Sequence, residues 1–258
     1  MRILLSNDDG IDSPGLLALH QEIDRIGGHE VWTVAPDGER SGMSHSITLK
    51  DPIKSRKIGE RRYCISGTPA DCIMTAVLGI MAEKPDIVLS GINLGPNLGT
   101  DLIYSGTAAA ARQAAYMGIP GVAVSINAFT SPWNFSALAR FTVQNLEGFI
   151  KLFDGNHFIN INGPEDGKMN APIEITHPCY RTYNDRMIQF IAPRGDEYWF
   201  LKGAPIDTSD EEGSDWNAVV RGSISVSPVH LHPLNNQVDE EYETAGFKSP
   251  GEGKVTNQ

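Results

Sequence analysis

The chain has 258 residues, of which 40% are hydrophobic, and a formal net charge of −11 at pH 7. This length and apolar content suffice for one large domain or two small ones with a real core. The negative charge argues against a nucleic-acid polymer as partner, because such binding needs a basic surface that displaces counterions.

Targeting and cysteine patterns are also informative. The apolar run at the N-terminus is too short for a signal peptide, and no later run approaches the roughly 18 apolar residues of a membrane span. We therefore expect a cytoplasmic protein without membrane contact. Cys64, Cys72 and Cys179 are odd in number and lack metal-ligand spacing, which predicts buried, reduced thiols.

The first ten residues predict a buried strand that ends on two carboxylates. The apolar run 2–6 leads directly into Asn7, Asp8 and Asp9. In open α/β sheets, ligands bind at the carboxyl ends of the strands. Adjacent carboxylates repel each other unless a divalent cation, which prefers hard oxygen ligands, offsets the repulsion. The alternative is a solvated Asp-Asp-Gly turn.

A helix and a second strand follow. Apolar residues recur at helical spacing from Leu16 to Ile26, and residues 30–35 form the next apolar run. This β-α-β unit predicts two parallel strands with a right-handed crossover. The polar loop 36–45, which contains Ser41, then becomes a candidate second wall of the site.

Residues 47–65 predict short strands with a solvated basic face, followed by a helix and another parallel strand. Thr68 is the expected N-cap of that helix and Pro69 lies in its first turn. The strand is expected at residues 86–91. The basic residues of the hairpin are Lys50, Lys54, Arg56, Lys57, Arg61 and Arg62.

Two polar segments follow this strand. The Gly- and Pro-containing loop 92–101 places Asn93 and Asn97 at the same sheet edge as Asp8, although loops of this kind also occur without a function. The segment 105–107 opens the helix 108–117. The free N–H groups and roughly +0.5 charge of a helix N-terminus make it a candidate anion cradle, with an ordinary serine cap as the alternative.

The remaining pattern predicts the domain organisation. A strand at 121–125, a helix at 133–153 and a strand at 158–161 complete an α/β, Rossmann-like parallel core over residues 1–162. Short strands and a helix at 210–220 predict a smaller, largely antiparallel annex over residues 163–233. The polar tail 234–258 is expected to be disordered. Residues 1–233 are thus one predicted domain.

Four segments converge at the carboxyl edge of this sheet. Together they offer two carboxylates, a hydroxyl and an amide oxygen, an oxygen-only set that suits one Mg²⁺ or Mn²⁺ ion. A helix N-terminus beside such an ion would hold a phosphate. The combination predicts metal-assisted hydrolysis of a phosphate ester.

Five motifs occur in a fixed order along the chain: Asn7-Asp8-Asp9-Gly10, Arg40-Ser41-Gly42, Ser66-Gly-Thr-Pro-Ala-Asp71, Ser90-Gly-Ile-Asn93 with Asn97, and Ser105-Gly106-Thr107. They resemble the motifs of the SurE (survival protein E) family of 5′-nucleotidases. The later stretch from Gly213 to Pro228 is also similar to that family, so the resemblance covers about residues 1 to 230.

The resemblance implies a function, a set of ligands and an assembly. It implies a metal held by Asp8, Asp9, Ser41 and Asn93, and a phosphate near Asn97, Ser105, Gly106 and Thr107. It implies hydrolysis of nucleoside 5′- and 3′-monophosphates and, in some members, of short polyphosphate. It also implies a homodimer or homotetramer with swapped or extended elements.

The mechanism has two alternatives. In the first, Asp8 or Asp9 orients a metal-activated water or accepts its proton. In the second, one of these residues becomes a phosphoaspartate, although phosphatases of that type carry Asp-x-Asp and not adjacent acids. No histidine has an evident role, and neither Ser41 nor Ser105 lies in a Gly-x-Ser-x-Gly elbow.

A different class of function is a non-catalytic module that binds nucleotide or phosphate, such as a Mg²⁺-dependent receiver. Receivers carry their phosphorylated Asp after the third strand, where this chain has Asn93. The greater length and the annex also argue against a receiver.

Overall fold

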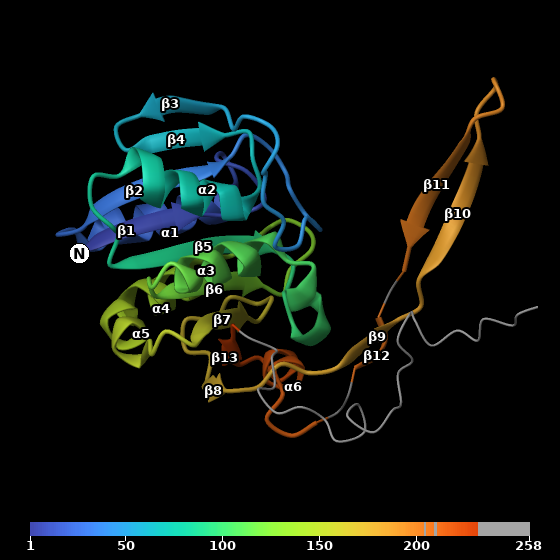
Figure 1. The fold of residues 1–258 in the computed structure, drawn as a ribbon. Helices are drawn as coiled ribbons and strands as arrows, with labels where there is room; N and C mark the ends of the chain where they lie inside the picture. Colours follow the sequence, from blue (N-terminus) through green and yellow to red (C-terminus); the bar gives the residue numbers. More distant parts are fainter. Residues whose placement is uncertain (204, 209–210, 232–258) are drawn as a thin grey trace, which may run out of the picture.

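The computed structural model describes residues 1–203, 205–208 and 211–231, so the predicted tail 234–258 lies outside the described residues. The strands of the main sheet are β1 (Arg2–Ser6), β2 (Glu30–Pro36), β3 (Ser55–Gly59), β4 (Arg62–Ile65), β5 (Ile87–Leu94), β6 (Gly121–Ile126), β7 (His157–Gly163), β8 (Ile173–Ile175) and β13 (Ile224–His230). Their spatial order is β3-β4-β2-β1-β5-β6-β7-β13-β8 (Figure 1).

The centre of the sheet is parallel, which confirms the predicted α/β class. The neighbouring strands β4, β2, β1, β5, β6 and β7 all run in the same direction, whereas β3 and β13 are antiparallel to their neighbours β4 and β7. The predicted β-α-β order therefore holds through the core.

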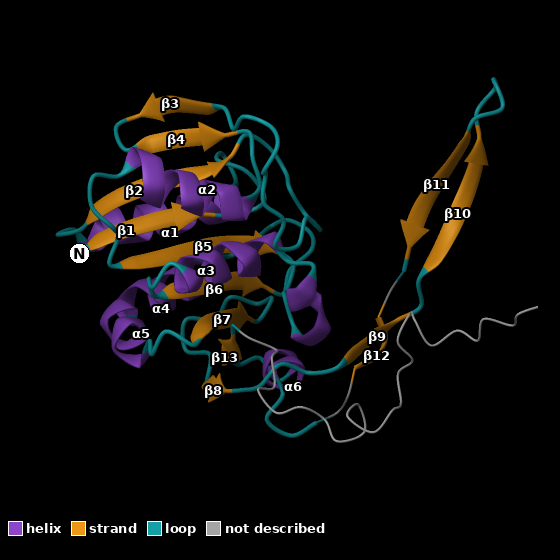
Figure 2. Cartoon of the chain, in the orientation of Figure 1, coloured by secondary structure: helices purple, strands orange, loops and turns teal. Residues whose placement is uncertain are grey.

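Helices cover both faces of the sheet (Figure 2). They are α1 (Pro14–Ile26), α2 (Pro69–Thr75), η1 (Ala76–Ile80), η2 (Gly99–Ile103), α3 (Gly106–Tyr116), α4 (Ser136–Gln144), α5 (Leu146–Leu152) and α6 (Asp215–Val220). The sequence predicted the start of α2 correctly: Thr68 caps it, and a reciprocal capping box with Asp71 satisfies its first N–H groups.

The side chains of β1 pack into the hydrophobic core on both faces of the sheet. Ile3 and Leu5 belong to one core cluster with α1, α4 and α5, whereas Leu4 belongs to a second cluster with α2 and α3. Since successive side chains of a strand point to opposite faces, an unbroken apolar run is what a doubly covered strand requires.

The single helix expected over 133–153 is wrong, because the structure contains α4 and α5 in its place. The break lies at Asn145, whose side-chain Nδ2 donates to the carbonyl of Phe141. Asparagine side chains compete for backbone partners in this way, and the apolar periodicity continues across the break without revealing it.

The C-terminal region divides between the main sheet and a projecting arm. Strands β13 and β8 extend the main sheet beyond β7. By contrast, β9 (Arg181–Tyr183) pairs with β12 (Pro205–Thr208), and β10 (Arg186–Ile191) pairs with β11 (Glu197–Lys202), both antiparallel. The β10–β11 hairpin, which we call the arm, projects away from the body of the molecule (Figure 1).

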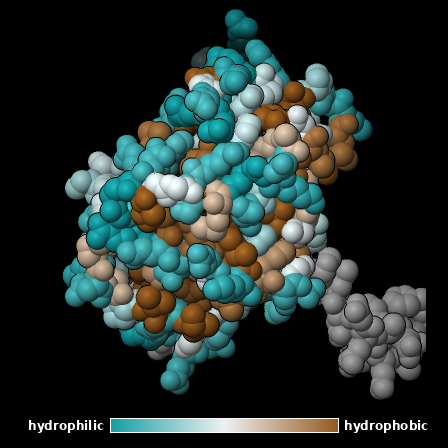
Figure 3. Space-filling view, turned by 90° about the vertical axis from the view of Figure 1, so that its left-hand side faces the viewer, coloured by the Kyte–Doolittle hydropathy of each residue, from teal (hydrophilic) through white to brown (hydrophobic). Residues whose placement is uncertain are grey.

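The cysteines agree with the prediction of buried, reduced thiols, since all three are free and buried. No helix in the described part of the chain is long and apolar enough to cross a membrane. The face drawn in Figure 3 carries separate hydrophobic patches among hydrophilic side chains.

Candidate functional site

The strand order brings the predicted site segments together. Strands β2, β1 and β5 are neighbours, so the loops that follow them share one edge of the sheet. A cavity of about 450 Å³ opens there. Its lining residues are Asp9, Gly10, Ile11, Asp12, Ser13, Pro14, Asp37, Gly38, Glu39, Ser41 and Leu94.

Asp8 is the buried member of the acidic pair. Only 4% of its surface is exposed, and Oδ1 accepts a hydrogen bond of 2.5 Å from Thr107 Oγ1. Burial raises the pKa of the Asp8 carboxyl, whereas the bonds from Thr107 and the backbone N–H of Gly106 oppose this rise. The first turn of α3 therefore faces Asp8.

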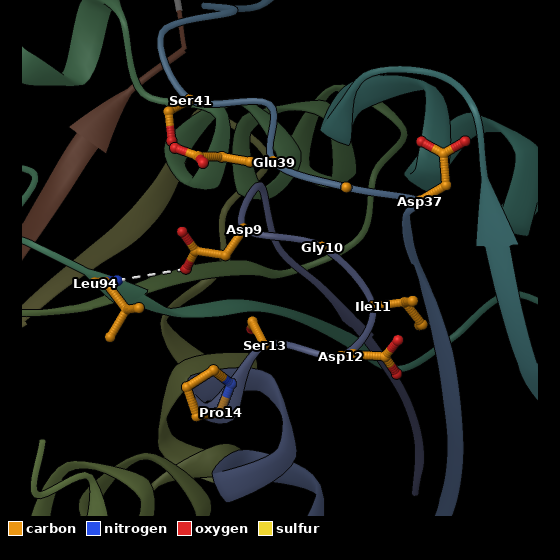
Figure 4. A pocket seen from close by; sticks show the side chains of 11 residues that line it. Asp9, Gly10, Ile11, Asp12, Ser13, Pro14, Asp37, Glu39, Ser41 and Leu94 are labelled. Carbon is orange, nitrogen blue, oxygen red and sulfur yellow. Dashed lines mark hydrogen bonds between the residues drawn. The ribbon is translucent and has the colours of Figure 1, made fainter. Parts of the chain in front are cut away.

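Asp9 forms part of the cavity wall. Figure 4 shows its carboxylate between Leu94 and the side chains of Glu39 and Ser41, and Oδ2 accepts from the Leu94 N–H at 3.4 Å. Burial, and then the charge of Asp8, raise the pKa of Asp9 to about 7. Two carboxylates in this position destabilise each other's ionised forms, and a divalent cation would reverse that effect.

The neutral members of the predicted metal shell fit an oxygen-bound cation. Ser41 lines the same cavity as Asp9. Asn93 Nδ2 donates to the Gly95 carbonyl at 2.8 Å, which leaves Oδ1 as the side-chain atom able to bind a cation. Across the described residues no group of three His, Cys, Asp or Glu side chains gathers around a metal position. The predicted donors, two carboxylates, a hydroxyl and an amide oxygen, would form a hard, oxygen-only set of the kind that Mg²⁺ and Mn²⁺ prefer.

The loop that carries Ser41 is fixed from two sides. Ser44 donates through its backbone N–H to the Tyr104 carbonyl and through Oγ to the Ile103 carbonyl, at 3.0 and 2.6 Å. Asp71 accepts from both the N–H and the hydroxyl of Thr48. This role of Asp71 was not predicted, although its position in a capping box with Thr68 indicates a carboxylate with several hydrogen-bond partners.

The predicted phosphate-binding residues do not line the cavity. Asn97 is buried, with Nδ2 donating to Ser125 Oγ at 2.8 Å, and Ser105 Oγ accepts from the Ala108 N–H as a helix cap. The structure brings Gly106 and Thr107 against Asp8 but places Asn97 in a separate polar network.

That network contains residues that the sequence analysis missed. Asn162 Oδ1 accepts from the Asn97 N–H, and the side-chain amides of Asn160 and Asn162 both donate to the Asn97 carbonyl. Two asparagines on the core side of an otherwise apolar strand were the available signal, because buried amides require dedicated partners. The carboxylates Asp12, Asp37 and Glu39 of the cavity wall were also missed.

Comparison with known proteins decides which family has this site. The family model described as "Survival protein SurE" matches residues 3–185. This chain belongs to the SurE family. The expectation drawn from the five ordered motifs is therefore confirmed.

The relatives match over nearly their whole length. A protein of Geotalea uraniireducens named 5′-nucleotidase SurE is 41% identical, with 91% of this chain and 95% of the relative aligned. A protein of the same name from Symbiobacterium thermophilum is 42% identical, over 89% and 92% of the two chains. The crystal structure of the SurE protein from Aquifex aeolicus superimposes on this chain with a TM-score of 0.80 and is 36% identical in sequence. The match covers 95% of this chain and 100% of the Aquifex aeolicus chain.

Proposed function

We propose that this protein is a metal-dependent 5′-nucleotidase that hydrolyses nucleoside 5′-monophosphates to nucleoside and phosphate. The observation that carries the proposal is the pair Asp8 and Asp9, one held by the first turn of α3 and the other open to a cavity, in a chain of the SurE family. The names of the relatives support the same activity.

We assign the metal to Asp8, Asp9, Ser41 and Asn93. When bound, one Mg²⁺ or Mn²⁺ ion would polarise the phosphoryl oxygens and lower the pKa of a water. Asp8 is fixed for this role by Thr107. Asp9 reaches the cavity, where it can orient the attacking water.

The phosphate is assigned to Asn97, Ser105, Gly106 and Thr107, for which the Asn97 amide would exchange its hydrogen bond to Ser125 Oγ for one to a phosphoryl oxygen. Supporting this, α3 begins at Gly106, and the positive end of its dipole is directed at the site. These N–H groups would stabilise the charge that develops on the phosphoryl oxygens. Nucleoside 3′-monophosphates and short polyphosphate are further substrates under this proposal.

We also propose that the arm assembles the protein into a homodimer or homotetramer. The arm exposes a set of large apolar side chains, each more than half accessible: Met187, Phe190, Ile191, Tyr198, Trp199, Phe200 and Leu201. Monomeric proteins rarely leave so many together, and a second copy of the chain would cover them. We place the protein in the cytoplasm, as one domain over residues 1–233.

The test is phosphate release from nucleoside monophosphates with Mn²⁺, with Mg²⁺ and with EDTA, for the wild type and for Asp8→Asn. The Asn side chain has the same shape but lacks the charge that binds the cation. Multiple turnovers that disappear with EDTA and fall by about 10²-fold or more in Asp8→Asn are expected. Nucleotide binding without turnover under any metal would refute the enzyme assignment.

A further inference from the structure

One segment links the two halves of the proposed site. Residues 97–105 run from the loop after β5, the strand whose last residues are Asn93 and Leu94, to Ser105, the N-cap of α3. The first turn of α3 in turn touches Asp8 through Gly106 and Thr107. The segment therefore leads directly into the helix start that contacts Asp8.

The C-terminal region holds this segment at several points. Asp101 accepts hydrogen bonds from Arg181 Nη1 and from the Tyr183 hydroxyl, both on β9 at the base of the arm. The Arg181 N–H donates to Thr100 Oγ1 at 3.0 Å. Asp215 joins the Gly99 and Cys179 N–H groups through its two oxygens, at 2.8 and 2.9 Å.

These contacts differ from an ordinary surface ion pair. The Arg181 side chain is 6% exposed and that of Asp101 is 18% exposed. The guanidinium also lies 5.0 Å from the Trp216 ring centroid and 5.7 Å from that of Tyr183. The ion pair and the two aromatic rings together fix the position of the buried Arg181 guanidinium. Removing Asp101 would leave this charge buried without its partner, which would lower the stability of the folded protein.

The backbone of residues 97–105 also packs closely against the C-terminal region. Gly99 has φ +50, and a Cβ atom there would lie 2.0 Å from the Cys179 carbonyl oxygen. Only glycine permits this approach of the segment to the loop that leads into β9. The base of the arm and the segment before α3 therefore behave as one packed unit.

We propose that Asp101, Arg181 and Tyr183 form a positioning clamp, through which the base of the arm holds the α3 N-terminus in register with Asp8. The clamp residues touch no reacting atom, and their effect passes through residues 97–105. This inference rests on the proposed function for the assignment of phosphate to α3. It makes hydrolysis depend on β9 at the base of the arm.

The variants are Asp101→Asn, Arg181→Lys and Tyr183→Phe, compared with the control Glu174→Gln. Glu174 accepts from Arg221 and Ser223 in the same C-terminal region, and among the described residues no hydrogen bond or ion pair joins it to residues 97–105. The control thus removes a polar group of the annex without altering the clamp. Circular dichroism and thermal unfolding show whether each variant is folded.

The readouts separate positioning from general damage. We measure kcat and KM for one nucleoside 5′-monophosphate, inhibition by inorganic phosphate, and Mn²⁺ binding by the free protein. Asp101→Asn and Arg181→Lys should lower kcat/KM by about 10- to 100-fold, the cost of a misplacement near 1 Å, and weaken phosphate inhibition. Mn²⁺ affinity should fall by no more than it does in Thr107→Val, because Asp8, Asp9, Ser41 and Asn93 are retained and only the hydrogen bond from Thr107 to Asp8 is disturbed.

The outcomes distinguish the two proposals. If wild type and Glu174→Gln hydrolyse nucleotide and the clamp variants equal them, the clamp is refuted while the function stands. If the wild type hydrolyses nothing, the function fails, and unchanged phosphate binding in the variants would refute the clamp as well. If Asp101→Asn does not fold, the test rests on Tyr183→Phe, which retains the ion pair between Asp101 and Arg181. Inorganic phosphate should then inhibit Tyr183→Phe less strongly than it inhibits the wild type, and equal inhibition would refute the clamp.

Discussion

The substitution Gly106→Ala tests how closely α3 must approach Asp8. A Cβ atom at position 106 would lie 2.8 Å from Asp8 Cβ, 2.9 Å from Asp8 Oδ2 and 3.0 Å from Pro69 Cγ. Non-bonded carbons prefer about 3.5–4.0 Å, so Asp8 or the helix must move by roughly 0.5–1.2 Å. The backbone of Gly106 lies outside the left-handed region, so steric contact alone is responsible.

The expected effect on activity is larger than the effect on stability. Overpacking costs about 1–3 kcal/mol, whereas replacing a glycine near a helix start by alanine returns up to roughly 1 kcal/mol. A displacement near 1 Å in the proposed site corresponds to about 10²-fold in rate. We therefore expect kcat/KM to fall by about two orders of magnitude, whereas the free energy of unfolding should decrease by only about 1–2 kcal/mol.

The assay is nucleotide hydrolysis with Mn²⁺, combined with thermal unfolding and a Mn²⁺ titration. Gly148→Ala in α5 is the matched control, because a Cβ atom there meets nothing within 4 Å. The control should retain full activity and gain slight stability. If Gly106→Ala hydrolyses nucleotide as fast as Gly148→Ala, the close contact between α3 and Asp8 has no part in the reaction.

Three further perturbations follow from the same contacts. Thr107→Val removes the hydroxyl that donates to Asp8 and should weaken Mn²⁺ binding by about 10- to 100-fold, measured by titration; unchanged affinity would contradict the assigned shell. Gly99→Ala should lower the free energy of unfolding, measured in urea, by about 1–3 kcal/mol. An unchanged urea midpoint would show that residues 97–105 can shift to accommodate the added methyl group. Burial raises the pKa of Cys179 from 9.0 to about 12, so only the unfolded chain ionises this thiol between those values. The stability present below pH 9 should therefore decline as the pH rises toward 12, and Cys179→Ala should decline less over that interval; equal slopes would refute the assignment.

Local patterns in the sequence were enough to predict the core elements. The apolar run of β1 and the Thr68 cap are recognised from residues that are close together in the sequence, so predicting them does not require the fold. The same patterns could not locate the break at Asn145, because it depends on which carbonyl the amide reaches. They also placed β13 in the annex, whereas in the structure β13 pairs with β7 of the main sheet. The sequence of an apolar strand does not specify which neighbouring strand it pairs with.

The sequence by itself predicted the family, the parallel core and a pair of carboxylates at the end of the first strand, because ordered motifs and strand ends are local properties of the chain. Only the tertiary structure decided that Asp8 faces Thr107 while Asp9 faces a cavity, since adjacent residues after a strand point in different directions. It likewise decided that Asn97 lies in a network with Asn162 and that Asp101 meets Arg181, 80 residues away along the chain. Such contacts arise from the order in which the strands pack, and no local spacing encodes that order.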